Sequence, residues 1–311
     1  MNIYISGSMA YDRIMDFPGR LSDHILPDKI HILNVCFNVN GMVEKFGGTA
    51  GNIAYSLSLL NERPIIIATI GKDHESYFDW LRKNNILEEG IKIIRDEFTA
   101  GAYIITDKAD NQITGFNPGA MKYPSEYTFN NADSKNSIGL IAPGNLQDMI
   151  EYAKTFKYKG IDFICDPGQS LTLWEGKTLR EWLDGSMLLI SNDYELELIM
   201  KMTGMDKRGL LGLTRTVITT LGEKGSLISN SESDMRIPSA KVLDVLDPTG
   251  AGDAYRAGLL KGIVTGRDLE TAAKMGAVAA SYAIEKYGTQ DHRYTYEEFA
   301  ERYTSNFGEL Q

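Results

Sequence analysis

The chain has 311 residues and a formal net charge of −10, and 43% of its residues are hydrophobic and 24% charged. This length can bury a large core, and the composition is typical of a folded globular protein rather than a disordered one. The acidic charge argues against a general nucleic-acid binder, which needs a basic face for phosphate backbones. Apolar runs such as residues 65–68 are far too short to cross a bilayer, so we expect neither a nucleic-acid nor a membrane partner.

Cysteines and histidines carry little functional signal in this sequence. Cys36 and Cys165 each lie within an apolar segment, so we expect both thiols to be reduced and buried, as in a cytoplasmic protein. The spacing of the histidines is not typical of a metal site. They are His24, His31, His74 and His292.

Short apolar runs alternate with helical patterns along the chain. Residues 3–7 predict a first strand that ends in a glycine turn. Further buried strands are predicted at residues 65–68, 139–142, 163–165, 188–190 and 217–219. Helices are predicted at residues 52–60, 147–156, 194–202, 253–286 and 296–303. Apolar strands separated by helices indicate an α/β fold with a mostly parallel central sheet covered on both faces.

Two further β-like regions stand outside this alternation. Apolar and polar residues roughly alternate over residues 32–39, which predicts an exposed or half-buried strand. Residues 102–116 predict a second β region, which closes with an Asn-Pro-Gly turn. We expect a small β lid formed by residues of about 13–46 and 98–120. No linker or repeat is visible, so residues 1–311 are predicted to form a single domain.

The most informative motif is Asp-Pro-Thr-Gly-Ala-Gly-Asp at residues 247–253. Gly250, Ala251 and Gly252 are small, and an apolar helix pattern follows them directly. The first N–H groups of a helix have no internal partner and carry the positive end of its dipole, so this turn predicts an anion pocket. Asp253, at the helix start, can act as a carboxylate base toward a hydroxyl group. Glycines and an aspartate alone would also suit an ordinary turn with a helix cap.

This motif resembles the C-terminal signature of the ribokinase-like (PfkB) family of sugar and nucleoside kinases. The resemblance implies a ribokinase-like three-layer fold with a small β lid. It also implies that Asp253 is the catalytic base and that the amides of Gly250, Ala251 and Gly252 form the anion hole.

A second group of matches implies an acceptor site. Residues 47–52 resemble the family's N-terminal Gly-Gly-x-x-x-Asn signature, which places Gly47, Gly48 and Asn52 at the acceptor. Gly48 permits close backbone approach, and Asn52 offers a donor and an acceptor to ligand hydroxyls. Asp12 follows the first strand, where ligands of open α/β sheets gather, and by resemblance binds two sugar hydroxyls. In isolation these residues also suit a turn at a helix start and a solvated loop.

A third group of matches implies the ATP site. Asn192 and Glu195 resemble an Asn-x-x-Glu element, whose Asn lies near the phosphates and whose Glu orients water around Mg²⁺. On their own they would equally form a helix cap. Thr220, Gly222 and Gly225 resemble a hairpin that contacts ATP, although glycine-rich hairpins are common. These five elements occur in the family's order over the chain.

The sequence does not match the motifs of other nucleotide-binding protein classes. A P-loop would need a glycine where Leu171 stands before Gly176-Lys177-Thr178. A dinucleotide-binding domain would need Gly-x-Gly-x-x-Gly after the first strand, and residues 7–12 lack it. No His-Arg-Asp or Asp-Phe-Gly motif of a protein kinase occurs.

The acceptor is predicted less directly than the kinase chemistry. Residues 7–12, 33–37, 112–121 and 287–290 look more like adenosine or nucleoside kinases of bacteria and archaea than like ribokinase or fructokinase. Phe37 and Phe116 lie in the predicted lid, where each ring could stack on a nucleobase or simply pack the lid against the body.

The resemblance therefore implies ATP-dependent phosphorylation of the 5′-hydroxyl of a nucleoside, with adenosine expected, and with Mg²⁺ and a monovalent cation such as K⁺. The partners are then a small-molecule acceptor and ATP. An exposed lid strand could also pair with a second subunit, so a homodimer through the lid is a further expectation. Two alternatives stay open: a sugar kinase of the same family, and a catalytically silent ligand-binding homologue.

Overall fold

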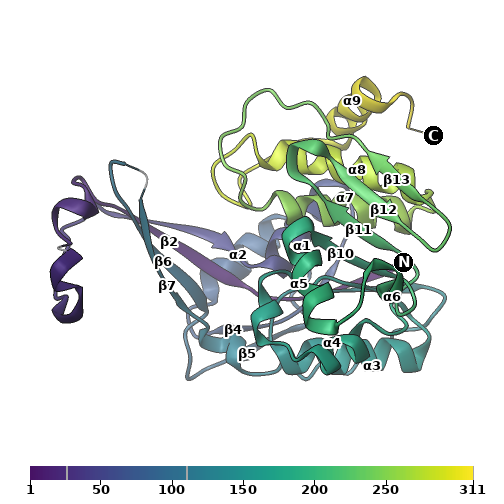
Figure 1. The fold of residues 1–311 in the computed structure, drawn as a ribbon, viewed down its shortest axis with the longest axis horizontal. Helices are drawn as coiled ribbons and strands as arrows, with labels where there is room; N and C mark the ends of the chain where they lie inside the picture. The colour runs from purple at the N-terminus through teal and green to yellow at the C-terminus, as the bar shows by residue number, and fades with distance from the viewer. Residues whose placement is uncertain (26, 110, 311) are drawn as a thin grey trace.

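The computed structural model of the chain describes residues 1–25, 27–109 and 111–310. Its larger part is a sheet enclosed by helices, and a smaller sheet projects from one side of it (Figure 1).

The main sheet, as far as the structure describes the chain, has nine strands in the order β13-β12-β11-β10-β9-β8-β1-β4-β5. All neighbours from β11 to β5 in this order are parallel, whereas β12 and β13 are antiparallel at one edge. This confirms the predicted mostly parallel sheet. The strands are β1 (Asn2–Ser6), β4 (Ile65–Gly71), β5 (Ile91–Ile94), β8 (Ser137–Ile141), β9 (Asp162–Cys165), β10 (Leu188–Asn192), β11 (Val217–Thr220), β12 (Ser226–Ser229) and β13 (Asp234–Ile237).

Helices cover both faces of the main sheet, and each face has its own apolar core. Ile190 and Ile218 belong to the core shared with α1, α2, α7, α8 and α9, whereas Leu189 and Val217 belong to the core shared with α3, α4 and α5. Successive residues of a strand point to opposite faces, so the two cores give the predicted three layers. The helices are α1 (Thr49–Leu59), α2 (Glu75–Lys83), α3 (Leu146–Lys159), α4 (Gly176–Leu183), α5 (Asp193–Thr203), α6 (Lys207–Leu210), α7 (Ala251–Val264), α8 (Leu269–Ala283) and α9 (Tyr296–Phe307). Short 3-10 turns are η1 (Leu21–Asp23), η2 (Pro27–Ile32), η3 (Gly119–Lys122), η4 (Gly168–Leu173) and η5 (Gly222–Lys224).

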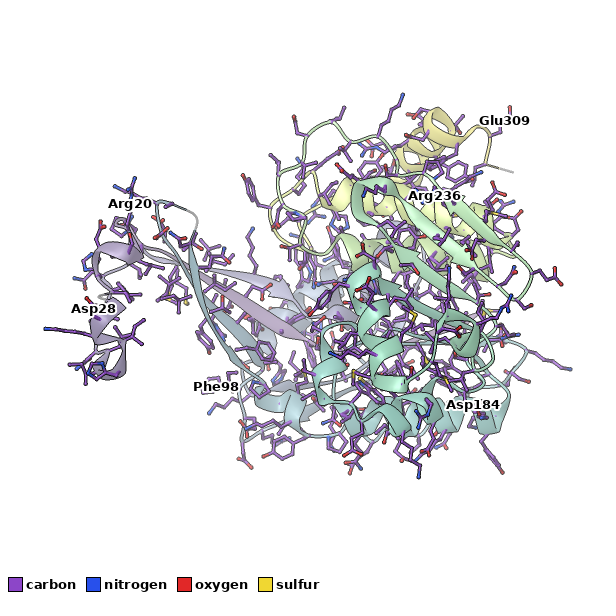
Figure 2. The ribbon with its side chains drawn as sticks, viewed as in Figure 1. Arg20, Asp28, Phe98, Asp184, Arg236 and Glu309 are labelled. Carbon is purple, nitrogen blue, oxygen red and sulfur yellow. The ribbon has the colours of Figure 1, made fainter. Side chains whose placement is uncertain are left out.

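The smaller sheet has the order β3-β2-β6-β7 in the described residues. Its strands are β2 (Ala10–Asp16), β3 (Met42–Gly47), β6 (Ala100–Thr106) and β7 (Gln112–Asn117). β6 and β7 lie within the predicted lid segment 98–120, whereas β2 begins before the predicted segment 13–46 and β3 ends one residue after it. Figures 1 and 2 show that the segment containing η1 and η2, with Arg20 and Asp28, lies at the tip of this sheet, away from the main body.

Two expectations for the segment after η2 are wrong. Residues 32–39 form no strand: Ile32 ends η2, and residues 42–47 take up the pairing with β2 and leave residues 33–39 without a neighbouring strand. Cys36 lies in this irregular segment and is exposed, whereas Cys165 is buried at the end of β9 as expected.

The described parts of the chain also contain no helix with the length and apolar composition that a membrane crossing requires.

Candidate active site

The start of α7 carries the motif that the sequence singled out. Gly250 is the N-terminal cap and adopts a left-handed conformation with φ of 80°, which glycine tolerates best. The amide of Ala254 donates to the Gly250 carbonyl at 2.9 Å. Within the described chain, the amides of Gly252 and Asp253 meet no protein acceptor, so these two N–H groups are available to an anion.

Asp253 lies in the first turn of α7 and is partly accessible to solvent. Burial raises the pKa of its carboxyl to about 6, although the Arg256 charge and a hydrogen bond from Asn52 partly offset this rise. Asn52 Nδ2 donates to Asp253 Oδ2 at 2.8 Å. A carboxylate with a pKa near neutrality is suited to accept a proton from a substrate hydroxyl.

Asn52 belongs to a buried set of polar side chains from three other elements. Its Oδ1 accepts from Gln290 Nε2 at 3.0 Å, and the same nitrogen lies 2.8 Å from the Tyr77 hydroxyl. Tyr77 in turn donates to the Gly47 carbonyl at 2.8 Å. This network connects Asp253 to the base of the small sheet, where β3 ends.

Asp12 lies on β2 beside Gly47. A Cβ atom on Gly47 would lie 2.7 Å from Asp12 Oδ2, so a larger residue there would push the Asp12 carboxylate out of its present position. Gly48 has φ of 89°, and a Cβ atom there would lie 2.6 Å from the carbonyl oxygen of Ser8. Burial, with a contribution from the Asp247 charge, raises the pKa of the Asp12 carboxyl. The structure thus brings Asp12, Gly47, Gly48 and Asn52 to one place, where the base of the small sheet meets the start of α1.

The two aromatic residues of the acceptor prediction lie in different places. Asp12, Ala102 and Phe116 form one cross-strand row on β2, β6 and β7, so Phe116 is on the same face of the sheet as Asp12. Its side chain is 55% exposed. The Phe37 ring instead packs on Phe17 at 5.0 Å, in the tip segment, and the structure does not bring it to Asp12.

The predicted ATP-site residues lie at the ends of β10 and β11. Asn192 and Glu195 form a capping box at the start of α5, with 2.7 Å from the Glu195 amide to Asn192 Oδ1. Thr220 ends β11, and Gly222 and Gly225 form the turn to β12. A Cβ atom on Gly225 would lie 2.0 Å from a backbone carbonyl of β13, so only glycine fits there.

Glu195 is the residue that the sequence predicts for a magnesium site. Burial, reinforced by the Asp166 charge, raises the pKa of its carboxyl. In the residues that the structure describes, no three His, Cys, Asp or Glu side chains lie together in a way that would hold a metal. Protein-bound Mg²⁺ usually keeps several waters and takes one or two carboxylates beside substrate phosphates, so a single Glu195 fits such an ion.

A buried ion pair near the base was not predicted from the sequence. Arg256 Nη2 donates to Asp166 Oδ1 at 2.7 Å, Arg256 Nε also contacts this carboxylate, and the two residues are only 7% and 2% exposed. Asp166 directly follows β9, and an aspartate at the end of a buried parallel strand was the available signal. Because Arg256 is paired in the interior, it acts on Asp253 through its field rather than by direct contact.

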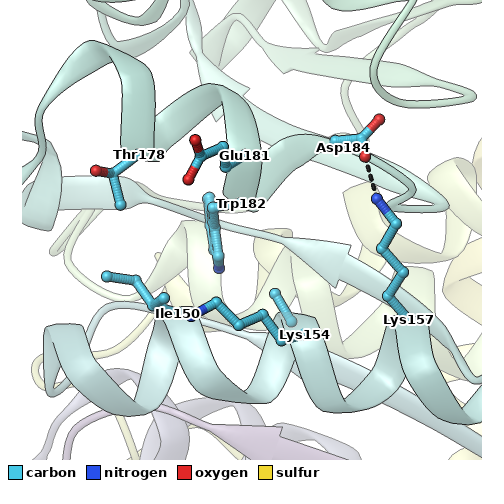
Figure 3. Close-up of a pocket in the computed structure, with 8 residues that line it drawn as sticks. Ile150, Lys154, Lys157, Thr178, Glu181, Trp182 and Asp184 are labelled. Carbon is cyan, nitrogen blue, oxygen red and sulfur yellow. Dashed lines mark hydrogen bonds and ion pairs between the residues drawn. The ribbon is translucent and has the colours of Figure 1, made fainter.

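A separate groove of about 230 Å³ lies between α3 and α4 (Figure 3). It is lined by Ile150, Lys154, Lys157 and Trp182, with an ion pair between Lys157 and Asp184 at one end. None of the predicted site residues lines it.

The fold and this site define a phosphotransferase of the ribokinase-like class. The sequence model described as "pfkB family carbohydrate kinase" matches residues 19–295. The chain therefore belongs to the pfkB family of carbohydrate kinases, and it is a nucleoside or sugar kinase that phosphorylates an alcohol group.

Three relatives illustrate this placement. A nucleoside kinase of Methanocaldococcus jannaschii is 32% identical over 272 residues, which are 86% of this chain and 89% of that protein. The Burkholderia thailandensis nucleoside kinase in complex with inosine is 35% identical, with a TM-score of 0.86 over 98% of each chain. Thermotoga maritima ribokinase, at 22% identity and a TM-score of 0.81 over 98% of this chain and 100% of that one, shares the fold.

Removal of the Asp166 carboxylate should strongly destabilise the protein. Asp166→Ala leaves Arg256 as an uncompensated buried charge, so we expect the free energy of unfolding to fall by about 3–5 kcal/mol in urea denaturation. The control is Asp184→Ala, which breaks the exposed ion pair with Lys157. It should lower the free energy of unfolding by at most about 1 kcal/mol. Equal losses in the two variants would contradict the importance of the buried pair.

Proposed function

We propose that the protein is an ATP-dependent kinase that phosphorylates the 5′-hydroxyl of a nucleoside, with adenosine as the expected acceptor and Asp253 as the base. The observation that carries the proposal is the position of Asp253. Its partly accessible carboxylate has a pKa of about 6 and lies at the start of α7, beside two amides without a protein acceptor. Proton removal and an adjacent anion pocket are the two requirements of phosphoryl transfer to an alcohol.

Asp12, Gly47, Gly48 and Asn52 are the proposed contacts to the ribose. Asp12 and Asp253 are both close enough to Tyr77 for their charges to raise the pKa of its hydroxyl, after the larger effect of burial. Asp12 accepts from ribose hydroxyls, and Asp253 takes the proton of the 5′-hydroxyl as it attacks the γ-phosphoryl group. Holding both partners in line supplies much of the rate.

Phe116 is the proposed stacking surface for the base. Strands of a sheet are about 4.8 Å apart, so Phe116, two strands from Asp12 in the same row, is about 10 Å away. A nucleoside can bridge this span, with its sugar at Asp12 and its base at Phe116. The inosine complex of the B. thailandensis relative supports a nucleoside acceptor. Phe37 remains a proposed second contact, which would require the tip segment to move.

The ATP phosphates are proposed to bind the amides of Gly250, Ala251 and Gly252. The Ala251 amide donates to the Pro248 carbonyl at 3.3 Å, so a contact with a phosphate would replace that bond. Asn192, Thr220, Gly222 and Gly225 contact the nucleotide, and Glu195 holds Mg²⁺ through water. A Mg²⁺ ion bound with ATP would neutralise phosphate charge. K⁺ is a proposed additional requirement.

The small sheet is proposed to act as a lid within a single domain of residues 1–311, with about 13–46 and 98–120 as its moving parts. Closure would exclude water that could otherwise hydrolyse ATP.

Asp253→Asn should reduce kcat severely, because a positioned base contributes roughly 10²–10⁴-fold to the rate. ATP affinity, measured by calorimetry, should stay within about threefold of wild type. The control Glu301→Gln removes one carboxylate from the exposed side of α9 and should leave kcat unchanged. Near-normal turnover in Asp253→Asn would remove Asp253 from the mechanism.

The raised pKa of Asp253 also predicts a pH-dependent effect on stability. Its pKa of about 6 lies above the unfolded value of 3.8, so its favourable contribution is present below pH 3.8 and is lost as pH rises through 6. Asp253→Asn should therefore raise the melting temperature at pH 7 but not at pH 4. An equal change at both values would contradict the raised pKa.

The acceptor is tested by ADP release with adenosine, inosine, cytidine, ribose and fructose, each with and without K⁺. We expect nucleosides to be the best acceptors, and Phe116→Ala to raise their KM by about 3–10-fold through lost stacking while leaving the KM of ribose unchanged. Tyr158→Ala, which removes an exposed ring on α3, is the control. A preference for a free sugar would favour the sugar-kinase alternative, and no ADP release with any acceptor would favour a silent homologue.

The homodimer is proposed to form through the face of the small sheet opposite Asp12. Met42, Met15, Ile105 and Ile113 form an apolar cross-strand row on that face, and Met42 and Ile113 are exposed. Such a row on a sheet with open edges favours pairing with a second copy. Analytical ultracentrifugation should find a dimer that Met42→Asp dissociates and Leu173→Asp, at an equally exposed apolar position of the main body, does not. A monomeric wild type would contradict this proposal.

A further inference from the structure

A chain of hydrogen bonds runs from Trp80 to the proposed base. Trp80 Nε1 donates to Gln290 Oε1 at 2.8 Å, Gln290 Nε2 donates to Asn52 Oδ1 at 3.0 Å, and Asn52 Nδ2 donates to Asp253 Oδ2 at 2.8 Å. The four residues come from α2, the loop after α8, α1 and α7. Every donor in this chain points toward Asp253.

Trp80 determines the direction of donation at one end of this series of hydrogen bonds. An indole N–H can only donate, so it can meet only the oxygen end of the Gln290 amide. That choice turns the Gln290 nitrogen toward Asn52 and the Tyr77 hydroxyl. Asn52 must then offer its oxygen to Gln290 and its nitrogen to Asp253. The Tyr77 hydroxyl acts in the same sense, because its own proton goes to the Gly47 carbonyl and it can only accept from the Gln290 nitrogen. Trp80 and Tyr77 together thus orient the Gln290 amide, and Gln290 orients that of Asn52.

The surrounding packing holds these amides in place. Gln290 is 3% exposed and Asn52 is 5% exposed, so water does not compete for their polar atoms. Gly51 makes room for the network, because a Cβ atom there would lie 2.0 Å from the Tyr77 hydroxyl oxygen. Alanine suits the interior of a helix better than glycine, but this contact leaves no room for an alanine at position 51. The Trp80 ring stacks on the Phe46 ring, with 5.1 Å between the ring centroids, and this contact holds Trp80 in place.

We propose that Trp80 and Gln290 are positioning residues that fix the Asn52 amide with its N–H group toward Asp253, and so keep this carboxylate oriented and ready to accept a proton. The proposal rests on the function proposed above for Asp253. Neither Trp80 nor Gln290 contacts Asp253 itself; both act through Asn52.

Several charged groups around Asp253 also affect the pKa of its carboxyl, and the Asn52 amide acts in addition to them. Arg256 on α7 stabilises the carboxylate, and Asp166 after β9 opposes it. The Glu195 charge on α5 acts on the same arginine, and the charges of Asp253 and of Asp12 on β2 both act on Tyr77 on α2. Asn52 is the neutral group that donates directly to Asp253. If its amide were free to reverse, an oxygen would face the carboxylate for part of the time, and the carboxyl would keep its proton to higher pH.

A double-mutant cycle on the pH profile of kcat/KM tests this proposal. Asn52→Leu should move the acidic limb to higher pH by about one unit, the size expected for one hydrogen bond to a carboxylate. Gln290→Met, uncharged and similar in length, should produce part of that shift. The double variant should match Asn52→Leu alone, because Gln290 acts through Asn52.

Two further variants keep the test independent of folding. Trp80→Phe retains an aromatic ring without the N–H group and should shift the limb in the same direction as Gln290→Met. The control Ser56→Ala removes a buried hydrogen bond to His292 from the same helix, so it should lower the melting temperature but leave the limb unmoved.

Additive shifts in the double variant, or an unshifted limb in both Gln290→Met and Trp80→Phe, would overturn the proposal. The proposed function fails separately, since it requires that Asp253→Asn lose turnover. If Asp253→Asn is inactive and the limb stays in place in the Gln290 and Trp80 variants, only the positioning role is wrong.

Discussion

The contact between Asn52 and Asp253 is the interaction on which the rest of the site depends. It joins residues 201 positions apart, one in the first turn of α1 and the other in the first turn of α7. A carboxylate at this place is costly because burial disfavours its charge, and the cost is reduced by one amide donor and the Arg256 field. The balance leaves a group that can both hold and release a proton near neutral pH, which a solvated aspartate would not do.

The fold creates this contact by bringing two glycine-rich helix starts to one side of the sheet. Gly48 and Gly250 each cap a helix with positive φ, and α1 packs against α7 on the same face. The small sheet joins the main body where β3 ends at Gly47. The strand that carries Asp12 pairs with β3, and the hydrogen-bond network of Asp253 reaches the Gly47 carbonyl, so the two meet at this point. The small sheet and the Asp253 carboxylate are therefore connected through a few hydrogen-bonded residues.

Much of this could be predicted from the sequence, because the motifs describe local geometry. The glycine-rich start of α7 and the apolar strands depend on near neighbours, and the structure has both. The stretch 253–286, predicted as one helix, is instead two helices, α7 and α8, separated by residues 265–268. The Gln290 and Trp80 contacts join residues 210 positions apart, which no local pattern encodes. The strand predicted at residues 32–39 is absent for the same reason. The alternation of apolar and polar residues there suits a strand, but a strand needs a partner strand, and β3 already pairs with β2. Phe37 and Phe116 had equal aromatic signals, and only the register of β6 and β7 separates them.

The most direct test of the account is a crystal structure with adenosine and a non-hydrolysable ATP analogue bound together. The account predicts that the 5′-hydroxyl lies about 3 Å from a carboxylate oxygen of Asp253, within hydrogen-bond reach. It also predicts that the terminal phosphate accepts from the amides at the start of α7, with Asn52 still donating to Asp253. A 5′-hydroxyl held by another residue, or phosphates bound away from residues 250–253, would contradict it.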